Sequence, residues 1–108
     1  MRIISKSRLR RFWAESKHRD AEGPLRAWYS VVSKATWKNW ADLRAVYRSA
    51  DLIGDCVVFN IAGNKYRLIT RIRYRPHKVY VLKVMTHREY DQGTWVHECG
   101  CLRPPPKR

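Results

Sequence analysis

The chain is 108 residues long and carries 23 Lys and Arg against 9 Asp and Glu, a formal net charge of +14. This length supports one domain with a modest core, and so large an excess of positive charge favours a polyanionic partner. No apolar run approaches the roughly 20 residues of a membrane span, and the charged N-terminus lacks the apolar stretch of a signal peptide. Three cysteines, an odd number, are typical of a reducing compartment, so we expect a cytoplasmic protein with no membrane association.

The first half of the chain shows helical periodicity. Residues 2–4 could form a short strand, and apolar residues at i, i+3 and i+4 then predict a helix over about 7–18. The same spacing, continued to i+7 from Leu25, predicts a second helix that ends near residue 34. Asp20 is a suitable N-cap for this second helix because its carboxylate can accept hydrogen bonds from the first free amides.

After residue 49 the apolar residues alternate along the chain, as they do in strands with one buried face. The three predicted strands cover residues 56–61, 66–74 and 79–85. Their connections, Gly63-Asn64 and residues 75–78, are short enough only for antiparallel neighbours. The expected architecture is an α+β domain whose N-terminal helices pack on one face of a small, mainly antiparallel sheet.

The domain is assigned to residues 1–98, and residues 99–108 to a flexible, basic and proline-rich tail. The segment His97–Cys101 contains four residues of types that bind metals. A structural zinc site requires four ligands in closed geometry, and no second cluster of Cys or His pairs with this one. We therefore expect no metal here and two ordinary thiols.

The middle strand alternates between basic and apolar residues. Its odd positions are mostly arginine, namely Arg67, Arg71, Arg73 and Arg75. The even positions from Tyr66 to Tyr74 are mostly apolar, so one face of the strand should be buried and the other nearly all arginine. Guanidinium groups match phosphate geometry, and this face is a candidate RNA-binding surface; a solvated sheet face is the plainer alternative.

The place of Lys83 on the next strand depends on strand register. A tight turn sets it opposite Thr70, on the apolar face. A slip of one residue sets it opposite Ile69 or Arg71, on the arginine face. The sequence leaves both registers open.

A histidine and a tyrosine follow the last predicted strand. His87 has a side chain that titrates near neutrality, and Tyr90 projects on the same side if His87 opens a helical turn. Surrounding cations are expected to stabilise a tyrosinate-like state. Glu89 and Asp91 are expected as counter-charges to Arg88 and the basic face. The plainer alternatives are a surface histidine and an aromatic residue at the edge of the core.

A series of short segments runs through the chain in a characteristic order. These are Asp20-Ala21-Glu22, Pro24-Leu25, Trp28-Tyr29, Phe59-Asn60-Ile61, Gly63-Asn64, Tyr66-Arg67-Leu68, Ile72 to Tyr74, Thr86-His87 and Glu89-Tyr90-Asp91. Together they resemble the HigB toxin family, over about residues 4–95. The chain departs from that pattern at Ala62, where a second glycine is common, and at Arg88, where alanine is common. Neither change removes a reactive group.

The resemblance implies a RelE-like fold and a toxin of a type II toxin–antitoxin system. It implies cleavage of mRNA, generally on the ribosome, with no metal and no cofactor. It also implies a HigA-type antitoxin with a helix-turn-helix domain. The toxin would then contact DNA only indirectly, through this antitoxin.

RNA cleavage without a metal uses the 2′-hydroxyl as nucleophile and needs a proton acceptor, a proton donor for the departing 5′-oxygen, and cations. The candidate catalytic residues are His87, Tyr90, Arg67, Arg73 and Lys83. The candidate RNA-binding residues are Asn64, Lys65, Arg71, Arg75 and Arg88. The sequence does not decide which of His87 and Tyr90 is the base. The alternative functions are a non-catalytic RNA- or ribosome-binding basic module and a toxin-like partner that only assists repression by its antitoxin.

Overall fold

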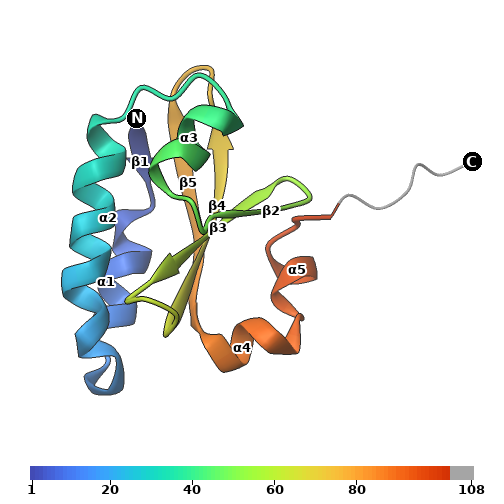
Figure 1. Cartoon of the computed structure of the whole chain (residues 1–108). Coiled ribbons are helices and arrows are strands. Elements are labelled where there is room, and N and C mark those ends of the chain that lie inside the picture. The colour runs from blue at the N-terminus through green and yellow to red at the C-terminus, as the bar shows by residue number, and fades with distance from the viewer. Residues whose placement is uncertain (103–108) are drawn as a thin grey trace, which may run out of the picture.

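The computed structural model describes residues 1–102 and places helices on both faces of a central sheet (Figure 1). The N-terminal elements are β1 (Arg2–Ile4), α1 (Lys6–Ala14), the 3₁₀ helix η1 (Ser16–Ala21), α2 (Glu22–Lys34) and α3 (Trp40–Val46). They are followed by β2 (Asp51–Ile53), β3 (Cys56–Ile61), β4 (Tyr66–Arg73), β5 (Lys78–Thr86), α4 (His87–Gln92) and α5 (Trp95–Glu98). The predicted α+β class is confirmed. No helix among these described residues is long and apolar enough to cross a membrane.

Within residues 1–102 the sheet has five strands, in the order β1-β5-β4-β3-β2. Strands β2 to β5 pair antiparallel with their sequence neighbours, whereas β1 pairs in parallel with β5. The sequence predicts β1, β3, β4 and β5 to within one residue at each end. It misses β2, because three residues are too few to display alternation.

The first helix is shorter than predicted. It ends at Ala14, where Glu15 takes an extended conformation, and η1 continues to Ala21. The predicted capping role of Asp20 is wrong, since α2 begins without a side-chain cap. The Asp20 carboxylate instead accepts a hydrogen bond of 2.6 Å from the Tyr66 hydroxyl and pairs with Lys65. This carboxylate therefore ties η1 to the start of β4.

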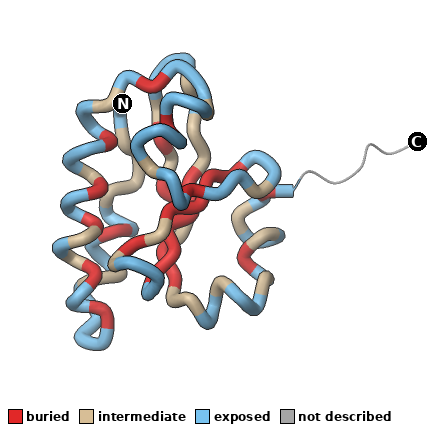
Figure 2. The backbone as a smooth tube through the Cα atoms, in the orientation of Figure 1, coloured by how far each residue is buried: buried red, intermediate tan, exposed pale blue. Residues whose placement is uncertain are grey.

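The main core fills the space between the sheet and helices α1 to α3. Leu9 of α1, Leu25 of α2 and Leu43 of α3 are fully buried in it. Trp28 of α2 packs edge-on against Phe59 of β3, with ring centroids 5.4 Å apart. Figure 2 shows the buried positions concentrated along the sheet and on the sides of the helices that face it. Burial of this apolar surface is the main stabilising term of the fold.

The opposite face of the sheet carries a smaller apolar cluster, called the minor core here. Its buried members are Cys56, Val58, Ile69, Met85, Trp95 and Cys101. Ile69 of β4 stands between Arg67 and Arg71, and Trp95 of α5 packs in the same cluster. The expected open arginine face is therefore wrong in its middle part, because α4, α5 and the segment after them lie over it (Figure 1).

A disulfide joins Cys56 of β3 to Cys101, with Cα atoms 5.1 Å apart and both side chains fully buried. The prediction of two ordinary thiols in the C-terminal segment is wrong for Cys101 and is confirmed for Cys99, which is a free thiol. The predicted flexible tail is also wrong for residues 99–101, which belong to the packed domain; residues 103–108 lie outside the described residues. Gly54 has φ of 56° and lies so close to this segment that a β-carbon there would clash with the Cys101 carbonyl oxygen.

The pairing of β4 with β5 settles the position of Lys83. Lys83 lies opposite Ile69, and an irregularity after Ile69 then shifts the register so that Thr70 lies opposite Val81. Of the registers that the sequence leaves open, the structure adopts one that places Lys83 on the arginine face.

Candidate active site

The candidate site is organised by the start of α4. The Thr86 side chain caps this helix by accepting from the Glu89 amide, and the Glu89 side chain accepts from the Thr86 amide in return, both at 3.2 Å. This reciprocal arrangement satisfies two amides that a helix start leaves free, and so fixes His87 as the first helical residue. The His87 amide also donates to the Lys65 carbonyl at 3.0 Å. The helix start therefore lies directly against the turn between β3 and β4.

His87 is paired with Asp91, one helical turn later. The His87 Nδ1 and Asp91 Oδ2 atoms are 2.9 Å apart, and the His87 side chain remains 44% exposed. A carboxylate at Nδ1 keeps the proton of a neutral imidazole on that nitrogen, which leaves Nε2 free to accept another proton. The expected counter-charge roles change accordingly. Asp91 orients His87, and Glu89 caps the helix.

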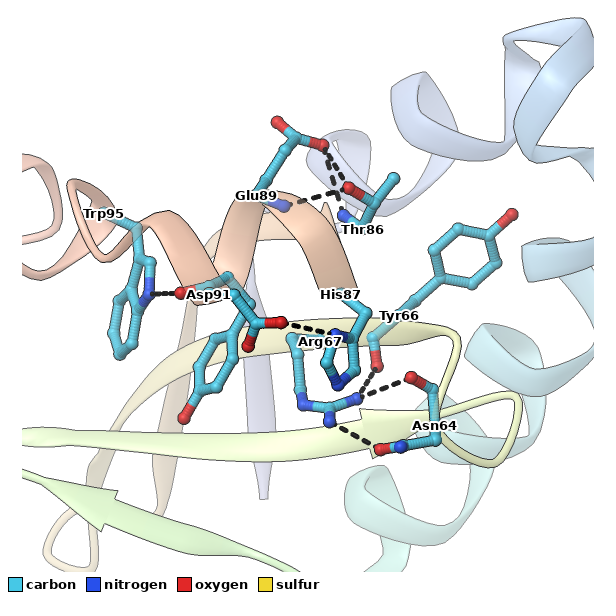
Figure 3. Close-up of polar contacts among 9 residues, drawn as sticks. Asn64, Tyr66, Arg67, Thr86, His87, Glu89, Asp91 and Trp95 are labelled. Carbon is cyan, nitrogen blue, oxygen red and sulfur yellow. Dashed lines mark hydrogen bonds and ion pairs between the residues drawn. The ribbon is translucent and has the colours of Figure 1, made fainter.

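Arg67 is buried beneath the turn rather than exposed on the strand. The residue is only 7% exposed. Its guanidinium donates hydrogen bonds to the Asn64 carbonyl at 3.0 Å, the Tyr66 carbonyl at 3.2 Å and the Asn64 Oδ1 at 2.5 Å. Figure 3 shows Arg67 and Asn64 joined in this way, with His87 and Asp91 gathered at the same end of β4. Arg67 thus holds the turn in shape and brings a positive charge beneath the site.

Tyr90 lies between Arg67 and Trp95. The Arg67 guanidinium is 5.2 Å from the centroid of the Tyr90 ring, and the Trp95 ring stacks on Tyr90 with centroids 5.0 Å apart and planes inclined by 17°. Burial raises the pKa of the Tyr90 phenol, Asp51 and Asp91 raise it further, and Arg67 opposes them. The expected tyrosinate-like state is therefore wrong, because desolvation outweighs the nearby cation. The raised pKa favours the neutral phenol over the tyrosinate.

Two of the predicted cationic side chains, Lys83 and Arg71, form hydrogen bonds with the segment after α4. The Lys83 ammonium pairs with Glu98 at 2.8 Å, and this hydrogen bond raises the pKa of Lys83. Arg71 donates to the Gly100 carbonyl at 2.9 Å and to the Cys99 carbonyl at 3.4 Å. Both side chains lie on the predicted face, but their contacts anchor the C-terminal segment.

Arg73 and Arg75 lie at the far end of β4 from His87. Arg73 lies six positions after Arg67 along the strand, which corresponds to roughly 20 Å. Arg73 lines a hollow of about 320 Å³ together with Arg71, Asp55 and Gly100. Arg75 lies in the β4–β5 turn, beside a separate hollow lined by Lys38, Tyr74 and His77. The structure does not bring these two arginines together with His87.

Two other predicted residues lie nearer. Lys65 belongs to the β3–β4 turn and pairs with Asp20, and its hydrogen bond to that carboxylate raises the pKa of the lysine. Arg88 follows His87 on α4 and is exposed. Within residues 1–102 no three His, Cys, Asp or Glu side chains are grouped as a metal site would require.

Sequence reasoning misses the roles of three residues in the site, among them Asp91, which it expects only as a counter-charge. Asp91 lies four residues after His87, a spacing that brings two side chains together on a helix, so the sequence could have predicted this pair. Thr86 followed by Glu89 is the pattern of a capping box and was equally readable. Trp95 carries no local signal, because its stacking on Tyr90 depends on the turn at Gly93, which ends α4 with φ of 79°.

Residues 21–93 match the model of the HigB toxin family, described as the RelE-like toxic component of a toxin–antitoxin system. This range contains α2 to α4 and every strand except β1, together with the candidate site from Asn64 to Asp91. The fold and the site thus define a RelE-like toxin.

Within that class, the chain belongs to the HigB toxin family. It is 33% identical over 87 residues to the mRNA interferase toxin HigB of Escherichia coli K12, a match that covers 78% of this chain and 84% of that protein. The mRNA interferase HigB proteins of Escherichia coli O157:H7 and Shigella flexneri match to the same extent. The family predicted from the sequence is confirmed.

Proposed function

We propose that this toxin is an mRNA endoribonuclease that cleaves translated message at the ribosome, without a metal, by using the 2′-hydroxyl of the RNA. Toxin activity follows from the family, and its relatives are named mRNA interferases. The observation that carries the proposal is the His87–Asp91 pair, 2.9 Å apart, on the same short helix as Tyr90, whose ring lies 5.2 Å from the Arg67 guanidinium.

The proposed reaction assigns one proton transfer to each residue. Nε2 of His87 takes the proton of the 2′-hydroxyl, and the 2′-oxygen attacks the adjacent phosphorus. Tyr90 gives its phenolic proton to the departing 5′-oxygen as the P–O5′ bond breaks. The products are a 2′,3′-cyclic phosphate and a 5′-hydroxyl end. Asp91 stabilises the imidazolium that forms on His87, as a carboxylate does beside other catalytic histidines.

We assign the arginines two roles, according to how far they lie from His87 and Tyr90. Arg67, beneath Tyr90, and Arg88, beside His87, would stabilise the extra negative charge on the phosphorane-like transition state. Arg73 and Arg75 lie too far along β4 for that role and would bind the RNA backbone further along. Binding should weaken with salt by a log–log slope of roughly one for each phosphate neutralised.

As the toxic component of a toxin–antitoxin system, the protein has an antitoxin partner. We infer a HigA-type antitoxin with a helix-turn-helix domain and an acidic segment that covers or distorts the basic face. DNA contact would then be indirect, through the antitoxin. Action on ribosomes places the toxin in the cytoplasm.

Inducible expression in a bacterium, with the 5′ ends of cellular mRNA mapped, tests the proposal. The parent chain should arrest growth and create new in-frame 5′ ends, and both His87→Ala and Tyr90→Phe should abolish them. His97→Ala is the matched control, since His97 is an exposed histidine of α5 outside the site. Cleavage by both variants at the parent rate would refute the assignment. Ribosome binding with intact message would favour the non-catalytic RNA-binding module.

A further inference from the structure

Tyr90 stands on a helix that has little packing of its own. Helix α4 spans six residues, and none of residues 87–92 is fully buried, although the Tyr90 ring is partly buried against the minor core. A helix this short is marginal in water without tertiary contacts, and its capping box fixes only the first turn. Contacts from outside α4 must therefore help to hold the Tyr90 ring in place.

Trp95 supplies those contacts. Its ring is stacked on Tyr90 at 5.0 Å, and its indole Nε1 donates to the Tyr90 carbonyl at 3.0 Å. One side chain thus holds both the ring and the backbone of the tyrosine. The Arg67 guanidinium, 5.2 Å from the ring centroid, adds a third contact.

Trp95 is itself firmly placed. It is 4% exposed and packs in the minor core with Ile69 and Met85. The segment that follows it is fixed by the disulfide at Cys101, whose amide donates to the Val96 carbonyl at 3.0 Å and whose carbonyl accepts from the Asp55 amide at 2.8 Å. The disulfide therefore ties the segment that carries Trp95 to Cys56 of β3.

We propose that Trp95 is a positioning residue for the reaction, which holds the Tyr90 phenol where it can protonate the departing 5′-oxygen. This inference rests on the function proposed for Tyr90. Trp95 also lies beyond residue 93, where the match to the family model ends. The segment after α4 therefore completes a site whose reacting groups lie on α4.

The conservative change Trp95→Phe keeps a stacking ring but removes the indole donor. Because misplacement of a catalytic group by about 1 Å can cost roughly 100-fold in rate, we expect Trp95→Phe to lower the saturating single-turnover rate about tenfold and Trp95→Ala about 100-fold. The half-saturating concentration of ribosome-bound mRNA should stay within about twofold, since Trp95 makes no proposed RNA contact. Trp40→Phe is the matched control and should leave the rate unchanged, because Trp40 lies on α3 across the sheet.

A changed leaving group separates positioning from mere loss of structure. A synthetic mRNA with sulfur in place of the 5′-bridging oxygen at the mapped cleavage position needs little protonation of its leaving group. This substrate should restore the rates of both Trp95→Phe and Tyr90→Phe to near the parent value. Circular dichroism of each variant gives the folded fraction by which the rates are corrected.

The possible results are distinct. If the sulfur substrate rescues Tyr90→Phe but not Trp95→Phe, the positioning role is wrong and the role of Tyr90 stands. If it rescues neither, or if Tyr90→Phe cleaves the ordinary mRNA like the parent, the acid role of Tyr90 fails and this inference fails with it. A loss in Trp95→Phe that only matches its unfolded fraction also overturns the proposal.

Discussion

The two faces of the sheet are built on different principles. The face under helices α1 to α3 is held by a continuous apolar core that contains Leu9, Trp28 and Phe59. The opposite face has only the small minor core, and its remaining contacts are polar ones made by candidate site residues such as Arg67 and Lys83. The first face decides whether the domain folds. The second decides whether the site is ordered once the domain has folded.

The largest expected effect lies on the helix-covered face. Trp28→Ala should lower the free energy of unfolding by about 3–5 kcal/mol, because it removes a ring that is 2% exposed and packed against Phe59. Urea unfolding at neutral pH measures this loss. Trp13→Ala on α1 is the control, since Trp13 is only partly buried and should cost clearly less. Equal losses for the two variants would contradict the idea of a core centred on α2 and β3.

The next effect concerns the other face. Reduction of the Cys56–Cys101 disulfide should lower the free energy of unfolding by about 2–4 kcal/mol, since it releases a link between residues 45 apart in sequence. Melting temperatures with and without a dithiol reductant measure it, and hydrogen exchange should locate the early loss of protection in residues 95–102. Cys99→Ser should keep the response to reductant, and Cys101→Ser should remove it. A response in both variants would show that the reductant acts elsewhere.

Two asparagines on opposite faces sharpen the comparison. Asn64→Ala removes an acceptor from the buried Arg67 and should cost about 1–3 kcal/mol. It should also lower mRNA cleavage, because Arg67 contacts Tyr90. Asn39→Ala removes the N-cap of α3 and should cost about 1 kcal/mol while cleavage is unchanged. Equal cleavage by both variants, after correction for the folded fraction, would show that the Asn64–Arg67 contact does not support cleavage.

The sequence predicts the helix-covered face far better than the other one. Periodicity places Leu9, Leu25 and Trp28 in the core because local helix and strand patterns report burial on one face directly. The minor core leaves no such pattern. It joins Cys56 to Cys101, and the spacing of two cysteines does not determine whether they meet.

The same contrast holds within the candidate site. His87 and Tyr90 are recognisable because they follow a strand and lie on one short helix. The partners of Arg71 and Lys83 were hidden, since both depend on how the chain returns over the sheet after Gly93. The direction of the Tyr90 pKa shift was wrong for a related reason. Charge can be counted from the sequence, whereas the burial that the fold imposes on a side chain cannot.

The smallest effect we expect is a dependence of stability on alkaline pH. Burial raises the pKa of Tyr90 above its ordinary value of 10.0, and burial with a hydrogen bond to Asp20 does the same for Tyr66 on the helix-covered face. Between pH 10.0 and the raised pKa values the folded chain holds more protons than the unfolded chain. The free energy of unfolding therefore falls as the pH rises through that window, and the full contribution of the two phenols is present below pH 10.0. Urea unfolding from pH 8 to 11 should therefore show a shallower decline for Tyr90→Phe than for the parent. An unchanged slope would mean that the phenol is solvated as in a free peptide, and that desolvation does not keep its proton in place for the departing oxygen.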